Sequence, residues 1–522
     1  MPLQLFGDFG FVGAEDNTAN PFQDSQQCIN YFAELSPSKS AKEIGSLLGT
    51  PGLIQVAAAP GGGAPGFSSS MTAWPQPSAV TNLPVRGMWV LPGRTQALVV
   101  IGNTCYLATI LVYGSLTTPG SLNLAKVGTL NSASGPVNIR DNDIGGFAVL
   151  VDGPNGYFYN IQTQAFTLIT DPAWLGSNTV AFIDGWWVFN QPGTQEFYTN
   201  FPQYGEAFSG SYFALKDAFS DKLMGVVENK EELWLLGEMT TEIWYDAGGT
   251  YFPFQRLVGT MLQIGCKAVY SISKLMTQGQ DGLIWLGRNE RGENVVVRTR
   301  GFTAEVVSTP AVSYALSQYV TTSDAIGYTY QEGTHEFYVL LLPTADATWV
   351  YDATMPPPLA WHQRLSYDPY AALFHRHRSN CYMNFGGMRI VGDYQNGALY
   401  QLTRAVQNDA GWPILSRRRA PIIWNKENRE RVFISSLQVD FSPGQGNSSG
   451  LGSNPQASLT LFKDYGKTPG NPVQAPMGQI GNYMNRCIWR KLGFSRGAVA
   501  QIDVIDPVNR DIVGSTLRAF GP

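Results

Sequence analysis

The chain is 522 residues long, and only 14% of its residues are charged, while 56 are glycine, 32 are proline and 12% are aromatic. This composition favours short strands and tight turns over long solvated helices. The sequence has no run of about 18 apolar residues, which excludes a transmembrane helix, and its N-terminus lacks the pattern of a signal peptide. The net charge of −5 argues against a sequence-specific DNA-binding protein, which usually carries a net basic domain.

Residues 1–85 form the first segment and are rich in glycine, proline, serine and alanine. We expect an N-terminal arm that leads into the first domain. A low-complexity stretch at 57–70 (AAAPGGGAPGFSSS) predicts a loop or flexible arm. Residues 38–48 (SKSAKEIGSLL) are the best candidate for a short helix.

A hairpin pattern recurs along residues 86–405. Each copy has a short apolar or aromatic strand, a turn with glycine or proline, and a second strand. The copies are 97–107 (ALVVIGNTCYL), 146–160 (GFAVLVDGPNGYFYN), 185–198 (GWWVFNQPGTQEFY), 232–245 (ELWLLGEMTTEIWY), 282–298 (GLIWLGRNERGENVVVR), 337–351 (FYVLLLPTADATWVY) and 381–402 (CYMNFGGMRIVGDYQNGALYQL). One turn residue from each is Gly102, Gly153, Pro192, Gly237, Gly287, Pro343 and Gly386, so consecutive copies lie 39 to 56 residues apart.

This period predicts a β-propeller with about four strands in each blade. One blade cannot bury both of its faces alone, and stacking blades around a ring covers them. Nearly continuous runs of tryptophan, valine and leucine are expected in strands that are buried on both faces. Seven hairpins predict six to eight blades, and a double-layer array of β-sandwiches is the alternative architecture.

Residues 406–522 predict an additional C-terminal β domain. The segment 431–441 (RVFISSLQVDF) alternates apolar and polar residues like a half-buried strand. A loop rich in glycine, serine and asparagine follows at 442–455, and further strands are expected at 457–462 and 486–492.

Five cysteines are scattered along the chain with no C-x-x-C pair. They are Cys28, Cys105, Cys266, Cys381 and Cys487. An odd, dispersed set in a long chain predicts reduced and mostly buried thiols, and therefore folding in a cytoplasm.

Patterns that could support catalysis or metal binding are weak. His375 and His377 stand two residues apart, but the neighbouring arginines in 374–378 (FHRHR) would repel a metal ion. A nucleophile elbow needs a strand before its serine and a helix after it. The G-x-S-x-G match at 446–450 lies inside a loop rich in glycine, serine and asparagine, and the match at 493–497 is followed by a strand-like run, so neither fits.

Paired carboxylates are harder to judge, because glycosidases bring two of them together from distant strands. Acidic residues at turns or strand ends of the repeats are Asp152, Glu238, Asp246 and Asp352. Such positions favour acidic residues for turn formation alone. We therefore expect no enzyme activity, no catalytic residues, no metal site and no cofactor.

Charge is distributed unevenly along the chain. Residues 411–522 have 14 Lys or Arg and 7 Asp or Glu, a balance of +7, and the first 410 residues have 21 and 33, a balance of −12. This asymmetry predicts regions that face different partners, or each other in a neighbouring subunit. The alternative is two domains whose surfaces vary independently.

The candidate residues for an interface or for phosphate contact come from the basic C-terminal region. They are Arg417, Arg418, Arg419, Arg429, Arg431 and Arg490, and Arg486, Lys491 and Arg496 belong to the same concentration. These cations could contact phosphates or an acidic protein surface, and an ordinary solvated face is the third possibility.

Three groups of segments carry a family resemblance. They are 24–30 (DSQQCIN), 31–35 (YFAEL) and 47–53 (LLGTPGL); 233–255 (LWLLGEMTTEIWYDAGGTYFPFQ), 265–266 (GC) and 282–302 (GLIWLGRNERGENVVVRTRGF); and 486–493 (RCIWRKLG) and 506–514 (DPVNRDIVG). Together they resemble, in order, the tail-hub proteins of short-tailed bacteriophages (podoviruses), also called packaged-DNA stabilisation proteins. The resembling motifs are structural and supply no active-site residues.

The resemblance implies a tail hub or nozzle in the virion, folded in the bacterial host cytoplasm and assembled as a homohexamer below the portal and its adaptor. Such a hub continues and closes the DNA channel until DNA ejection, lies close to DNA without sequence-specific binding, and docks tail fibres, spikes or a needle. We expect an acidic channel wall, because fixed positive charges would hold the phosphates. The alternative is a β-propeller that binds or cleaves glycans, which two facing carboxylates with stacked tryptophans at one channel mouth would favour.

Overall fold

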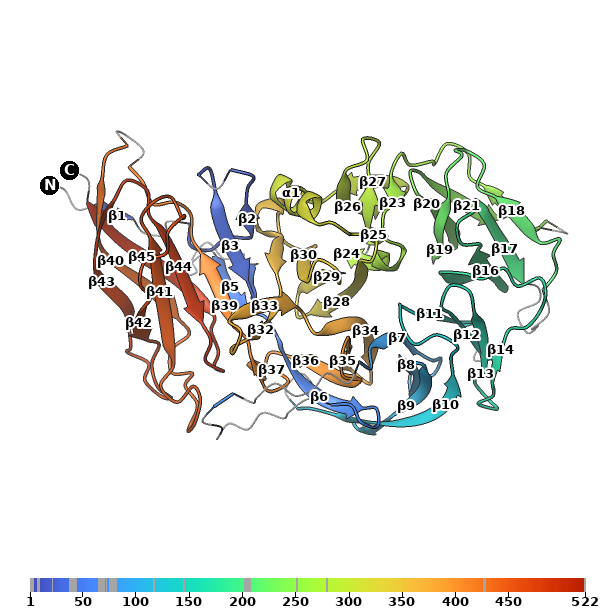
Figure 1. Ribbon diagram of the computed structural model, residues 1–522, viewed down its shortest axis with the longest axis horizontal. Coiled ribbons are helices and arrows are strands. Elements are labelled where there is room, and N and C mark those ends of the chain that lie inside the picture. The colour runs from blue at the N-terminus through green and yellow to red at the C-terminus, as the bar shows by residue number, and fades with distance from the viewer. Residues whose placement is uncertain are drawn as a thin grey trace.

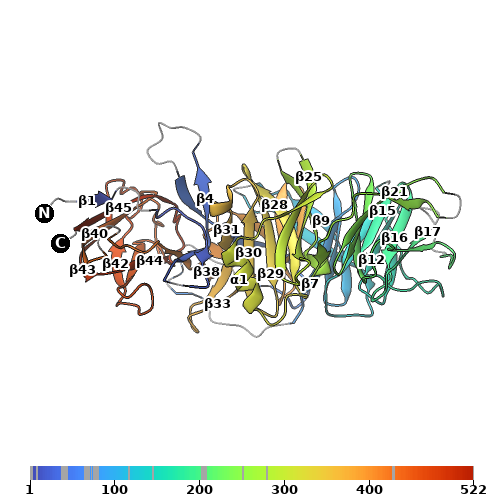
Figure 2. The ribbon, with the colours of Figure 1, turned by 90° about the horizontal axis from the view of Figure 1, so that it is seen from above.

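The computed structural model describes residues 4–6, 10–20, 22–36, 45–63, 71, 73–74, 82–115, 118–143, 146–200, 208–249, 252–277, 280–425 and 429–520. A β-propeller and a β-sandwich lie next to each other along the long axis of the molecule (Figures 1 and 2). The helical elements in these ranges are α1 (Pro310–Gln318) and the 3-10 turns η1 (Val269–Ser271) and η2 (Pro357–Leu359). The prediction of a mainly β protein is confirmed.

The propeller has seven blades within the described residues. In chain order they are β7 (Val85–Val90), β8 (Gln96–Ile101), β9 (Thr104–Val112) and β10 (Ser121–Thr129); β11 (Asn138–Asp141), β12 (Phe147–Val151), β13 (Gly156–Asn160) and β14 (Phe166–Leu168); β15 (Val180–Ile183), β16 (Trp186–Asn190), β17 (Glu196–Asn200) and β18 (Phe213–Leu215); β19 (Leu223–Asn229), β20 (Glu232–Gly237), β21 (Thr241–Asp246) and β22 (Phe254–Arg256); β23 (Gly265–Cys266), β24 (Ser273–Thr277), β25 (Gln280–Arg288), β26 (Asn294–Arg300) and β27 (Thr303–Val306); β28 (Ile326–Glu332), β29 (His335–Leu342), β30 (Ala347–Asp352) and β31 (Trp361–Gln363); and β34 (Ser379–Phe385), β35 (Met388–Asp393), β36 (Ala398–Thr403) and β6 (Gly52–Ala58). A hairpin of β32 (Leu365–Asp368) and β33 (Leu373–Arg376) lies between the sixth and seventh blades in the chain, and β37 (Asn408–Asp409) and β38 (Trp412–Pro413) extend the seventh sheet beyond β6.

In most blades the second strand, such as β8 or β12, carries a nearly continuous apolar run because both of its faces are buried. In β8, Leu98 and Val100 pack in the cluster shared with the second blade, whereas Val99 and Ile101 pack in the cluster shared with the seventh blade. Successive side chains in a strand point to opposite faces, so a strand between two neighbours needs apolar residues at both parities. The apolar core is accordingly divided into layers between adjacent blades.

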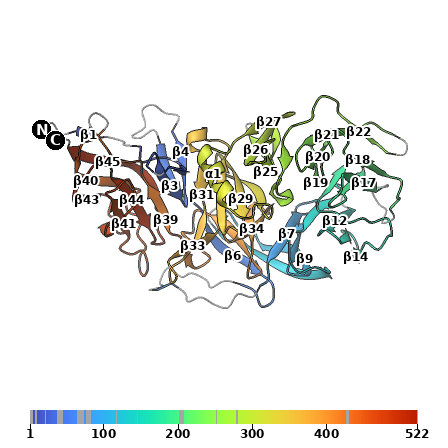
Figure 3. The ribbon, with the colours of Figure 1, turned by 45° about the horizontal axis from the view of Figure 1, so that its top comes forward.

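The ring closes through a strand from the N-terminal part of the chain. β6 pairs antiparallel with β36 and supplies the outer strand of the seventh blade, and it appears as a blue strand beside the orange strands of that blade (Figures 1 and 3). The innermost strands β34 and β7 contact each other, which joins the last blade to the first. Val56 of β6 packs in the same apolar layer as Val85 and Ile390.

The predicted hairpins correspond to the blades. Six of them coincide with the two middle strands of a blade, from β8–β9 to β29–β30, and the seventh spans β34, β35 and β36. The seven blades lie within the predicted range of six to eight, and the ring excludes the double-layer array.

The sandwich packs two sheets against each other. One sheet has the order β4 (Tyr31–Leu35), β5 (Gly45–Gly49), β45 (Ile512–Phe520), β40 (Val432–Phe441) and β43 (Cys487–Ser495), with β1 (Gln4–Phe6) also paired to β45; the other has the order β3 (Ser25–Ile29), β39 (Ser416–Arg419), β44 (Val499–Val504), β41 (Gln456–Phe462) and β42 (Val473–Pro476), with β2 (Asp16–Asn17) paired to β3. Inward residues such as Ile434, Leu437, Leu459 and Ile502 form its core. The strands expected at 431–441, 457–462 and 486–492 are confirmed as β40, β41 and β43.

One continuous sheet joins the propeller to the sandwich. β3 pairs in parallel with β31 of the sixth blade and antiparallel with β39 of the sandwich. Asn30, which follows β3, is 1% exposed and has a φ of 58°. Its Nδ2 donates to the carbonyl oxygens of Leu365 and Leu415, both at 2.8 Å, and its Oδ1 accepts from the backbone N–H of Leu365 at 2.9 Å. This side chain therefore ties three segments together at the junction.

Two local expectations for the N-terminal segment differ from the structure. The helix expected at 38–48 is wrong where it is described, because residues 45–48 belong to β5, which pairs with β4 and β45; residues 38–44 lie outside the described residues. Of the loop expected at 57–70, residues 57 and 58 belong to β6, and 64–70 lie outside the described residues. The five thiols are free and four of them are buried, as expected from their number and spacing.

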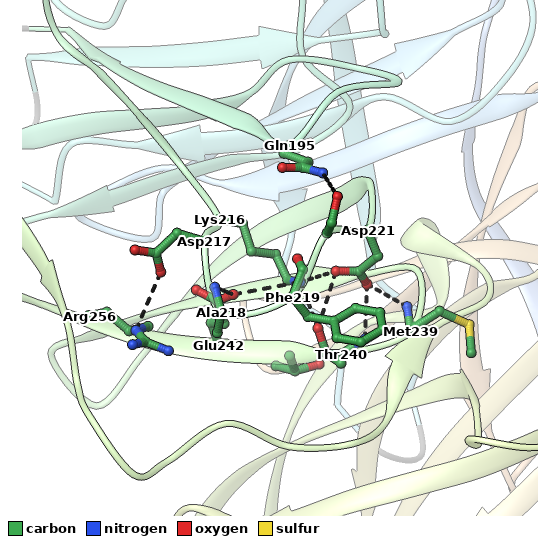
Figure 4. A network of polar contacts seen from close by, with 12 residues as sticks. Gln195, Lys216, Asp217, Ala218, Phe219, Asp221, Met239, Thr240, Glu242 and Arg256 are labelled. Carbon is green, nitrogen blue, oxygen red and sulfur yellow. Dashed lines mark hydrogen bonds and ion pairs between the residues drawn. The ribbon is translucent and has the colours of Figure 1, made fainter.

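A buried polar cluster holds the third blade against the fourth (Figure 4). Lys216 is fully buried, and its Nζ contacts Asp221, Thr240 Oγ1 at 2.6 Å and Glu242 Oε1 at 3.7 Å. Asp221 Oδ2 also accepts from the backbone N–H groups of Met239 and Thr240 at 2.6 and 3.0 Å. Because buried charges are costly unless they are paired, this arrangement fixes the connection between β18 and β19.

Candidate interaction surface

The axis of the propeller encloses a cavity of about 380 Å3. Its lining includes Trp89 of β7, Arg140 of β11, Glu228 of β19 and Lys274 of β24. Glu228 Oε2 accepts from Lys274 Nζ at 2.6 Å and from Arg140 Nη2 at 3.3 Å, and Arg140 Cζ lies 5.1 Å from the centre of the Trp89 ring. These three charged side chains therefore pair with one another and link the second, fourth and fifth blades.

The acidic residues considered for catalysis do not meet at this cavity. Among the described residues that line it, Glu228 is the one carboxylate. Asp152, Glu238 and Asp246 lie at turns or strand ends of the second and fourth blades, and Asp352 ends β30 of the sixth blade. Asp352 is buried, and its Oδ2 lies 2.7 Å from His335 Nδ1.

The two neighbouring histidines have separate environments. His375 is exposed, and its Nδ1 lies 2.7 Å from Asp346 Oδ2. His377 is buried with Nδ1 2.7 Å from Ser379 Oγ, and its burial, with nearby arginines, lowers its pKa well below the ordinary value. Across the described ranges, no group of three or more His, Cys, Asp or Glu residues is placed to hold a metal ion, and no helix is long and apolar enough to cross a membrane.

The run Arg417–Arg419 lies in β39, in the middle of a sheet. Strand alternation points Arg418 into the protein, where it is fully buried and donates to the carbonyl oxygens of Phe11, Ala14 and Gln27 at 2.7 to 3.2 Å. Arg417 faces the other way and forms a two-point ion pair with Asp503, at 2.8 and 3.0 Å.

Arg419 is also engaged within the chain. Its Nη2 donates to the carbonyl oxygen of Gly466, and its Cζ lies 4.3 Å from the centre of the Phe462 ring. All three arginines of the run therefore bind atoms of their own chain and help to hold the sandwich together.

The other candidate arginines lie on the surface of the sandwich. The exposed Lys and Arg residues among the described ones from 411 onward are Arg429, Arg431, Lys463, Lys467, Arg486, Arg490, Lys491, Arg496 and Arg518. Glu430 is the one exposed acidic residue in the same described ranges. The sandwich therefore presents a basic surface, and Arg518, on the last strand, adds to the residues expected from the sequence.

A row of aromatic rings crosses the same surface. On the outward face of the sheet, Phe433 of β40 stands directly opposite Phe494 of β43 and Phe520 of β45. Phe433 is 46% exposed and Phe494 is 57% exposed. The Phe433 and Phe520 ring centres are 6.1 Å apart, and Arg431 Cζ lies 5.1 Å from the centre of the Phe494 ring.

These phenylalanines were not among the residues expected from the sequence. The alternation in 431–441 gave the signal, because the buried Val432 and Ile434 require Phe433 between them to face outward. Its partners Phe494 and Phe520 come from strands far apart in the chain, and only the pairing of the strands brings them together.

Solved structures that resemble this chain include two distant ones. Nup159 (N-terminal domain) is 9% identical with a TM-score of 0.37, and the match covers 71% of this chain and 98% of that one. PorZ, an essential surface component of the type-IX secretion system of Porphyromonas gingivalis, is 10% identical with a TM-score of 0.34, covering 69% of this chain and 44% of that one. No curated protein sequence matches the chain.

Two family models match the two parts of the architecture. The model described as bacteriophage P22 Gp10, β-propeller, matches residues 112–407, and the model described as bacteriophage P22 Gp10, β-sandwich, matches residues 418–519. Both descriptions agree with the ring of blades and the two packed sheets at those positions. The chain therefore belongs to the bacteriophage P22 Gp10 family, the packaged-DNA stabilisation or tail-hub family of short-tailed phages, and is a structural protein of the phage tail.

Proposed function

We propose that this protein is the hub, or nozzle, of the tail, and that six copies form a ring below the portal and its adaptor. The observation that carries the proposal is the family match over both the propeller and the sandwich. In this assembly the ring continues the DNA channel, helps to close it before ejection, and docks fibres, spikes or a needle. Its action is mechanical, without enzymatic activity or a cofactor.

In this proposal, DNA passes between copies and not through the axis of one propeller. The axial cavity of about 380 Å3 is of the size that holds a small molecule, not a DNA duplex. We expect acidic residues on the wall of the shared channel, since the first 410 residues have a balance of −12 and such a wall would let DNA slide. An assembled ring with a basic wall would contradict this part of the proposal.

Electron microscopy of the purified protein, alone and mixed with a portal–adaptor complex, tests the proposal. We expect rings that dock coaxially below the adaptor. A chain that never joins the portal complex, even at high concentration, would contradict a hub function. Glycan screening would then follow, because a glycan-binding or glycan-cleaving propeller is the alternative.

A further inference from the structure

The outward face of β43, β40 and β45 carries two adjacent rows of side chains, one aromatic and one cationic. The aromatic row is Phe494, Phe433 and Phe520, and the next row along the strands places Arg490 and Arg518 on either side of Ser436. Paired residues on neighbouring strands lie about 5 Å apart, so each row forms a continuous strip across three strands.

This combination is typical of the centre of a protein interface. Exposed aromatic rings supply the apolar contact area, and arginine and aromatic residues account for most binding hot spots. The charge of the surface around such a centre is usually opposite in sign to the charge of the partner surface. The described part of the sandwich exposes nine cations from residue 411 onward against two acids, Glu430 and Glu34 of β4. This surface therefore calls for an acidic partner surface with apolar or aromatic residues of its own.

The propeller of this same chain carries a surface of that kind. The turns β15–β16 and β19–β20 and the end of β21 bring together Asp184, Glu231 and Asp246, and Glu232 stands opposite Tyr245, which is 38% exposed. The pKa of Asp184 is raised by partial burial and then by the negative charges of Asp246 and Glu231. Lys230 lies at the same turn and offsets part of this charge. We name these acidic residues with Tyr245 the acidic patch.

The two surfaces lie at opposite ends of the molecule. β40, β43 and β45 form the far left of Figure 1, and the third and fourth blades, with β16 and β21, form its right-hand end. A contact between the two surfaces within one chain is therefore ruled out, and only another copy can supply it.

We propose that the Phe and Arg rows of one copy dock on the acidic patch of a second copy, in a head-to-tail contact. The inference rests on the proposed ring and names the surfaces that build it. Because the two surfaces differ, each copy has one of each kind and can bind two neighbours. Such a heterologous contact closes into a ring when its rotation allows it.

Mass photometry of purified variants tests the contact. Phe433→Ser with Phe494→Ser removes the aromatic row, and Glu231→Lys with Glu232→Lys reverses the acidic patch. The self-association of each double variant should be weaker than that of the wild type by a factor of roughly ten or more. Phe302→Ser is the matched control, since Phe302 is 40% exposed on a turn of the fifth blade and should leave assembly unchanged. Thermal unfolding of all variants checks that they fold.

Mixing the two double variants gives the sharpest result. Each lacks one surface but retains the other, so the mixture should form dimers of one copy of each variant and nothing larger. Variants that assemble like the wild type would overturn the proposal, and so would a mixture that stays monomeric while the wild type assembles. Binding of duplex DNA by this face, without self-association of the wild type, would also overturn it.

The outcomes separate this inference from the proposed function. Protein that docks on the portal–adaptor complex but assembles without these surfaces contradicts the head-to-tail contact alone. Protein that assembles through them but never docks contradicts the hub function alone.

Discussion

Replacing Asn30 by alanine tests how the propeller and the sandwich are held together. The change orphans three buried backbone groups, the carbonyls of Leu365 and Leu415 and the N–H of Leu365. Each buried group left without a hydrogen-bond partner lowers the free energy of unfolding by about 1 kcal/mol or more, so the three groups together lower it by roughly 3 kcal/mol. The φ of 58° adds about 1 kcal/mol, because alanine fits the left-handed region less well than asparagine does. We expect a total loss of about 4 kcal/mol in the free energy of unfolding.

Asn82→Ala is the matched control for this substitution. Asn82 has a φ of 51° but is exposed, so its replacement carries the backbone cost of about 1 kcal/mol alone. Urea unfolding followed by tryptophan fluorescence compares the two variants, and limited proteolysis shows whether the junction opens first. Equal losses in both variants would refute the reasoning, since the three hydrogen bonds would then contribute nothing.

Three further predictions concern buried charge. Lys216→Met leaves two buried carboxylates without their cation and should lower the free energy of unfolding by about 3–5 kcal/mol. The control Lys222→Met, at an exposed position, should change it by less than about 0.5 kcal/mol. Similar unfolding free energies of the two variants in urea titrations would contradict the pairing. Burial, with the charge of a nearby arginine, lowers the pKa of both His362 and His377. Below about pH 6.5 the unfolded chain therefore binds protons that the folded chain does not. The melting temperature should decrease as the pH is lowered from about 6.5 to 5, and a melting temperature that stays constant over this range would contradict the lowered pKa values. Arg418→Met should lower the free energy of unfolding by about 3 kcal/mol or more, because it leaves several buried carbonyls without a hydrogen-bond donor. Thermal unfolding measures this loss, and an unchanged melting temperature would show that water replaces the guanidinium.

The blades were predictable because their central strands leave a strong trace in the sequence. A strand such as β8 is buried on both faces, so its residues 97–101 (ALVVI) read as one apolar run bounded by turn residues. This signal is local and repeats once per blade. The number of hairpins therefore indicated the number of blades to within one.

Long-range pairing was beyond sequence reasoning. Nothing local in residues 52–58 assigns that strand to the last blade, because its pairing partner β36 lies about 340 positions later in the chain. The local pattern of residues 45–48 predicted a helix, but pairing with β4 places them in a strand. The arginine run at 417–419 resembled a surface patch because a strand in the middle of a sheet rarely carries three cations. The burial of Arg418, in the middle of the run, depends on carbonyls of residues 11–27, some 400 positions away.

The closure of the ring by β6 affects how the chain is made. Ala58 pairs with Ala398, 340 positions later. At a synthesis rate of roughly 5–20 residues per second, β6 leaves the ribosome about 17–70 s before its partner strand. During that interval the apolar stretch 52–58 has an unpaired edge, which is open to wrong pairing with other nascent chains. The first six blades are synthesised before β6 can pair with β36, so the ring of blades closes only after most of the chain has been translated.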